Sequence, residues 1–237
     1  MMIRRVMVAA LALLGAACAK GKEDDMGSAS ATQAGNPAMD GAEYTLVFRN
    51  NWTAATHPFE YPASNAISGP HYSGIVGAAH NATFSLFKQG AMPTPGLEML
   101  SEMGKPAPLD EEIKAAITAG TASGLFTTGP LRDLKDSIVA TFRVDAAHPL
   151  VSFVAMIAPS PDWFTGAADV NLMEGGEWAA SKTLELYAWD AGGDDGPTYK
   201  SADRDNNPKK PVMQATSRHF SANGTAIPVA FVTITKK

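Results

Sequence analysis

The chain has 237 residues, of which 45% are hydrophobic and 18% are charged, so it can form a folded core and is not a disordered chain. Its formal net charge is −5 at pH 7, and no long basic run is present. These features argue against nucleic acid as a partner and against a surface that binds acidic lipids by charge.

The first residues have the features of a secretion leader. Two arginines begin it, and the apolar run over 6–14 is too short to span a bilayer. Small residues then precede Cys18, the only cysteine of the chain, which resembles the bacterial lipoprotein signal. We expect a signal peptide over 1–18 and lipid attachment at Cys18. Because Ala19 rather than aspartate follows, the resemblance favours the outer membrane, with secretion as the other extracellular outcome.

Residues 19–42 are rich in Ala, Gly, Ser, Asp and Lys without apolar periodicity, which predicts a flexible tether. We expect one folded domain over 43–237. Its first strand is predicted over 44–49, and prolines then interrupt an irregular stretch. Two more strands are predicted between 71 and 88, one around Ile75 and one over 83–87.

The apolar period changes over 95–120, where two short helices are predicted. The first has apolar residues spaced by three, and the second opens with acids in its first turn, where the helix dipole favours them. The apolar residues of the two expected stripes are Leu97, Leu100, Met103, Ile113, Ala116 and Ile117.

After a predicted loop over 121–136, strands dominate again. Alternating or continuous apolar patterns predict strands over 138–144, 149–158, 183–189 and 229–235, with a polar loop over 200–211. Many strands with the helices gathered in one insertion predict a mostly β fold, an antiparallel β-sandwich of about eight strands.

Two stretches of the chain, each at the end of a predicted strand, carry carboxylates. Asp162 lies in the stretch 158–166, and Asp190, Asp194 and Asp195 lie in 188–196. Two unit charges about 4 Å apart repel by roughly 4 kcal/mol at an effective dielectric near 20. If the loops meet, a hard cation such as calcium, which takes oxygen ligands, would neutralise them. The alternative is that both stretches are plain solvated turns, and their spacing does not fit an EF-hand.

Several motifs in this order and spacing resemble a spondin domain, the amino-terminal module of F-spondin-type extracellular matrix proteins. They are Arg49-Asn50-Asn51-Trp52, Thr56-His57-Pro58, the glycine-rich run 71–80, His148-Pro149-Leu150-Val151-Ser152-Phe153, Pro159-Ser160-Pro161-Asp162-Trp163-Phe164 and Trp189-Asp190-Ala191-Gly192. The resemblance implies an eight-stranded antiparallel sandwich.

The resemblance also implies one bound Ca²⁺, with Asp162, Asp190 and Asp194 as its ligands. Asp195 is an extra acid relative to the family pattern, and is expected near the ligands or simply exposed. The cysteines that animal members have near 173–177 are absent here, so no disulfide is expected there.

The leading hypothesis is therefore a non-enzymatic, calcium-binding module on the cell envelope that mediates adhesion or binds an extracellular protein or glycan. Contact with the membrane is expected only through the lipid anchor. A calcium ion with a purely structural role is a second hypothesis. A metal-dependent hydrolase that uses Asp162, Asp190 and Asp194 is the enzymatic alternative, but the five histidines show no zinc spacing and no nucleophile elbow is present.

Overall fold

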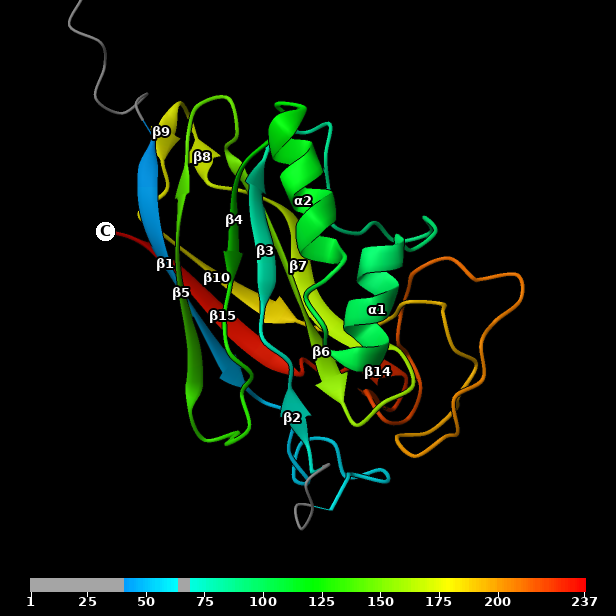
Figure 1. Cartoon of the computed structure of the whole chain (residues 1–237). Coiled ribbons are helices and arrows are strands. Elements are labelled where there is room, and N and C mark those ends of the chain that lie inside the picture. The colour runs from blue at the N-terminus through cyan, green and yellow to red at the C-terminus, as the bar shows by residue number, and fades with distance from the viewer. Residues whose placement is uncertain (1–40, 64–68) are drawn as a thin grey trace, which may run out of the picture. The chain divides into compact units, whose positions relative to one another are not determined.

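The computed structural model describes residues 41–63 and 69–237 (Figure 1). The signal peptide predicted over 1–18, with Cys18, lies outside the described residues, as does nearly all of the tether predicted over 19–42. The folded part lies within one compact unit, Gly35–Lys237.

The described part of the chain has two helices and fifteen strands, many of them only two or three residues long. The helices are α1 (Pro95–Met103) and α2 (Leu109–Thr118). The strands are β1 (Ala42–Asn50), β2 (His71–Tyr72), β3 (Val76–His80), β4 (Ala122–Thr127), β5 (Ser137–Val144), β6 (Leu150–Ala158), β7 (Trp163–Asn171), β8 (Met173–Glu174), β9 (Glu177–Trp178), β10 (Ser181–Leu186), β11 (Ala188–Asp190), β12 (Met213–Gln214), β13 (Ser221–Ala222), β14 (Thr225–Ala226) and β15 (Ala230–Lys236).

Two antiparallel sheets form the sandwich. One has the order β10-β15-β1-β5, and the other has the order β12-β11-β7-β6-β3-β4, with β2 paired to β6. The first and last long strands, β1 and β15, lie side by side in the four-stranded sheet, with Tyr44 opposite Lys236 (Figure 1). The main core lies between the sheets and includes Leu46, Phe153 and Val232.

The two helices cover the outer face of the larger sheet (Figure 1). A second apolar cluster joins them to it and includes Leu97, Ile113 and Val154. The α1 helix begins where the Thr94 side chain accepts a hydrogen bond from the Leu97 N–H (3.1 Å), and it ends at Gly104, whose φ of 64° suits glycine. This layer explains why β6 is buried on both faces, whereas β5 alternates strictly between exposed and buried residues.

The sandwich and its helical insertion are confirmed, but several local predictions are wrong. Residues 83–87 form no strand, because the Asn81 side chain accepts the Thr83 N–H (3.0 Å) and holds a turn. Residues 122–127, predicted as loop, form β4 against β3. The strand predicted over 183–189 divides at Tyr187 into β10 and β11, which belong to different sheets.

Two further corrections concern the helices and β7. Met103 and Ile117, expected on apolar stripes, are 58% and 37% exposed because α1 and α2 end beside solvent there. The strand β7 was not predicted, because its Gly-Ala-Ala run has little β propensity. Within the described residues, no helix is long and apolar enough to cross a bilayer.

Candidate metal centre

Two neighbouring strand ends bring Asp162 and Asp190 together. The turn from β6 to β7 is closed by the Ser160 hydroxyl, which accepts the Trp163 N–H (3.1 Å) and donates to the Ile157 carbonyl. This turn puts Asp162 immediately before β7. Because β11 pairs with β7 and places Asp190 opposite Trp163, the two aspartates lie at adjacent ends of one sheet.

Asp162 is completely buried. Its Oδ2 accepts the backbone N–H groups of Gly193 (2.8 Å) and Asp194 (3.1 Å). Its Oδ1 is buried and has no hydrogen-bond partner among the described residues. Burial, and then the charge of Asp190, raise the pKa of Asp162 to about 7. One oxygen of a buried carboxylate is therefore left without the donor that such a group normally requires.

Asp190 and Asp194 differ in how they are bonded. The Asp190 Oδ1 accepts the Gly192 N–H (2.9 Å), and burial raises the pKa of this carboxyl. Both oxygens of Asp194 accept backbone N–H groups, Oδ1 from Gly196 (2.5 Å) and Oδ2 from Arg204 (2.6 Å). The Asp194 carboxylate thus fixes its own loop, and it would have to release these donors to join Asp162 and Asp190.

Asp195 lies outside this group and faces solvent. It pairs with Lys210 (2.6 Å) and Arg204 (2.8 Å), and the hydrogen bond and charge of Lys210 lower the pKa of Asp195. Asp195 was expected either near the ligands or simply exposed, and in the structure it is exposed.

The loop after β11 depends on two glycines, of which only Gly192 belongs to a motif quoted above. Gly192 has a φ of 80°, and a Cβ there would lie 2.1 Å from the Lys210 carbonyl oxygen. A Cβ on Gly193 would lie 2.5 Å from Oε1 of Glu102. The buried Asn206 side chain also donates to the Gly192 carbonyl (3.1 Å). The Gly-Gly pair was the available signal, whereas nothing local in the sequence links Asn206 or Glu102 to this loop.

The donor set fits a hard cation in part. No group of three or more His, Cys, Asp or Glu side chains is gathered to hold a metal ion in residues 41–63 and 69–237. Asp162, however, offers a buried carboxylate with one oxygen that has no partner, and Asp190 offers a half-buried carboxylate beside it. Oxygen ligands of this kind suit calcium rather than a metal that prefers nitrogen or sulfur.

Comparison with known proteins places the chain in a family. The family model Spondin_N matches residues 42–226, which includes both aspartate loops. The chain belongs to the spondin amino-terminal domain family. This spondin domain is 32% identical to human Spondin-1 over 182 residues and 32% identical to human Spondin-2 over 177 residues, each covering 74% of this chain. Spondin-1 of Xenopus laevis is 31% identical over 205 residues, or 81% of this chain.

The relatives are longer than this spondin domain. The matched part spans 22% of human Spondin-1, 25% of the Xenopus protein and 53% of human Spondin-2. The family membership therefore concerns the sandwich and its loops.

A hollow of about 390 Å³ opens beside the aspartates of this spondin domain. Asp190, Asp194 and Asp195 line it together with Lys210, and both neutral polar residues and apolar residues such as Trp163 complete the wall. No histidine is among the described residues that line it. His57 and His148 lie elsewhere and are held in their loops by hydrogen bonds to Thr56 Oγ1 and to the Asp145 carboxylate (both 2.9 Å).

Proposed function

We propose that this spondin domain is a non-enzymatic calcium-binding module that acts outside the cell. Asp162 and Asp190 supply the primary ligands, and Asp194 joins them when its carboxylate turns from its backbone donors. The observation that supports this proposal most directly is the buried, unpartnered Oδ1 of Asp162 beside a second carboxylate. A divalent cation supplies the positive charge that this pair lacks.

Calcium is the cation that suits these residues best. It accepts six to eight oxygen ligands in irregular geometry, including backbone carbonyls and water. The hollow beside Asp190 admits solvent, so water can supply further oxygen ligands. When bound, the ion would tie the β6–β7 turn to the loop after β11 and thereby shape this end of the sandwich.

The cellular setting is part of the same proposal. The relatives Spondin-1 and Spondin-2 support an extracellular adhesion role, in which the module binds a protein or glycan partner outside the cell. Lipid attachment at Cys18 would hold the module at the cell envelope, and that anchor would be its only contact with the membrane. Cys18→Ser, followed by fractionation, tests the anchor: the variant should leave the membrane fraction, and retention there would contradict it.

We propose no catalytic role for the site. A metal-dependent hydrolase needs an open metal position beside a positioned base or nucleophile. Around the hollow, the carboxylates that would serve as bases are bonded to backbone N–H groups or to Lys210 and Arg204.

Thermal unfolding of residues 35–237 tests calcium binding. A metal-stripped sample is compared with one in about 2 mM calcium, in the wild type and in Asp190→Asn. Extracellular calcium modules bind at about 0.1–1 mM, and at the tight end this concentration stabilises the folded state by roughly 1.8 kcal/mol. The melting temperature should rise by about 4–7 °C in the wild type and not in Asp190→Asn. No rise in a folded, metal-free wild type would contradict calcium binding at these two loops.

A further inference from the structure

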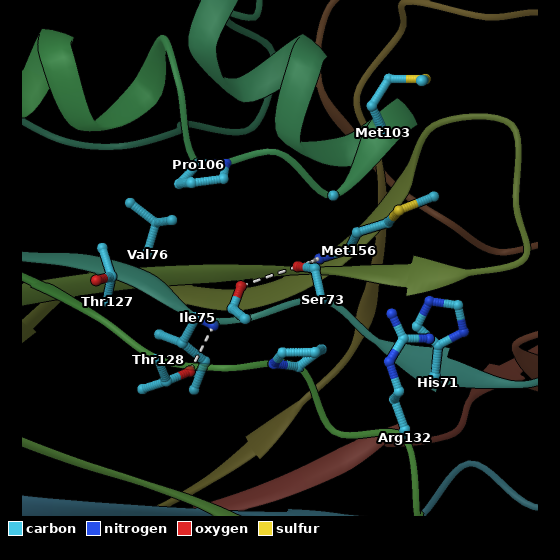
Figure 2. A pocket seen from close by; sticks show the side chains of 13 residues that line it. His71, Ser73, Ile75, Val76, Met103, Pro106, Thr127, Thr128, Arg132 and Met156 are labelled. Atoms are coloured by element: carbon cyan, nitrogen blue, oxygen red, sulfur yellow. Dashed lines mark hydrogen bonds between the residues drawn. The ribbon is translucent and has the colours of Figure 1, made fainter.

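A second hollow, of about 310 Å³, lies between the carboxyl end of α1 and the strands β2 to β4 (Figure 2). It shares no lining residue with the hollow beside the aspartates. Its wall is only slightly more apolar than polar, and Met103, Met156 and Pro106 are among the apolar side chains that line it (Figure 2). Met103 is 58% exposed, so a large apolar side chain stands uncovered at the entrance.

The polar groups in the floor of this hollow are already satisfied. The Ser73 hydroxyl accepts the Met156 N–H (2.8 Å) and donates to the Gly74 carbonyl (2.9 Å). The Thr128 hydroxyl accepts the Ile75 N–H (2.9 Å) in the same way (Figure 2). These two hydroxyls are therefore held by the backbone and do not need a ligand as a hydrogen-bond partner.

The lining also includes two side chains that carry nitrogen donors, Arg132 and His71 (Figure 2). The Arg132 guanidinium makes no ion pair or hydrogen bond with any residue in the described part of the chain. Nδ1 of His71 is bonded to the Gly69 carbonyl (2.8 Å), which leaves Nε2 free of that contact. No carboxylate is among the described side chains that line the hollow.

We propose that this hollow binds a small carboxylic acid with an apolar chain. The carboxylate lies on the Arg132 guanidinium, whose planar fork matches the two oxygens of a carboxylate. The chain lies between Met103 and Met156, since methionine side chains adapt to irregular apolar ligands. The volume corresponds to roughly ten water-sized groups, which suits an acid of about eight carbons.

Octanoate is the probe for this site, and methionine-methyl NMR of the ¹³C-labelled protein is the readout. Octanoate should shift the Met103 and Met156 methyl signals in a saturable manner. Arg132→Gln should weaken this binding about tenfold or more, because it removes a charged hydrogen-bond pair. Lys135→Gln, which removes a positive charge from the same loop but not from the lining, should leave the affinity unchanged.

Octan-1-ol is the matched neutral ligand, and it should bind at least about tenfold more weakly than octanoate. Two results would overturn the proposal: equal affinity for the acid and the alcohol, or an Arg132→Gln variant that binds octanoate as the wild type does. Octyl phosphate binding more tightly than octanoate would also overturn it.

The acid can be a free molecule or the carboxyl terminus of a peptide. A tetrapeptide that ends in leucine separates these sources when it is titrated with a free and with an amidated terminus. Tighter binding of the free peptide than of octanoate assigns the site to a peptide terminus, and the opposite order assigns it to a free acid. Either order supports carboxylate binding, provided that amidation of the carboxyl terminus weakens binding of the peptide.

Discussion

Replacing Asp162 by asparagine should have opposite effects with and without calcium. In the wild type, the N–H groups of Gly193 and Asp194 donate to Oδ2 of Asp162. The Oδ1 atom of the asparagine can accept the same two hydrogen bonds. The substitution removes the carboxylate charge and puts an amide N–H₂ in place of Oδ1. Burial, and then the charge of Asp190, raise the pKa of Asp162 to about 7. An unfolded aspartate has a pKa near 3.9, so the ionised native state is destabilised by about 4 kcal/mol at most.

The pH dependence follows from which state holds the proton. Between about pH 4 and pH 7, the native state retains a proton on Asp162 that the unfolded state has released. The free energy of unfolding of the metal-free protein should therefore fall as pH rises through this window, and the loss should be complete near pH 8. In Asp162→Asn this part of the pH dependence should disappear.

Urea unfolding at pH 5 and pH 8, in EDTA and in calcium, measures both effects. In EDTA at pH 8, the free energy of unfolding of Asp162→Asn should exceed that of the wild type by about 2 kcal/mol. This gain is roughly half of the upper limit, because the new amide N–H₂ group takes the place of an oxygen that had no hydrogen-bond partner. In calcium the wild type should regain stability and the variant should not. If the variant is the less stable protein in EDTA at pH 8, the account of Asp162 as a destabilising buried charge is wrong.

Two other substitutions test the surroundings of the site. Gly166→Ala should reduce the free energy of unfolding by about 3 kcal/mol, because its Cβ would lie 2.1 Å from the Phe153 carbonyl oxygen. The control in urea unfolding is Gly124→Ala, whose Cβ would meet no atom within 4 Å. This control should change the free energy of unfolding by less than about 0.5 kcal/mol. Asp195→Asn should leave the melting temperature in EDTA almost unchanged, because the ion pairs of Asp195 are exposed. The variant should also keep the full calcium-dependent rise in melting temperature. Loss of that rise would make Asp195 a calcium ligand.

The parts of the fold that were predictable are those with a strong local pattern. The strict alternation of β5 and the continuous apolar run of β6 identify strands because each face is either wholly buried or wholly exposed. The strand β4 has Ser123 and Gly124 near its start, which predict a loop. It forms because β3 supplies a complete antiparallel partner, and such a partner is invisible in the local sequence.

The candidate site was also predictable only in part. The aspartates could be selected from their place after strands and from family motifs, and β7 and β11 do bring Asp162 and Asp190 together. The bonding of each carboxylate could not be predicted. Gly193 lies 31 residues from Asp162, and Arg204 belongs to a polar loop with no periodicity, so only the folded chain shows which oxygen is left without a partner.

The pairing of β1 with β15 also determines when this domain can fold. Residues 44–50 find their partners only at residues 230–236, almost at the other end of the domain. A chain that crosses a membrane amino end first has no central pair in its smaller sheet until those last residues arrive. Contacts between such distant residues form slowly, because a long loop has to close first. The domain can therefore close its sandwich only after residues 230–236 are available to pair with β1.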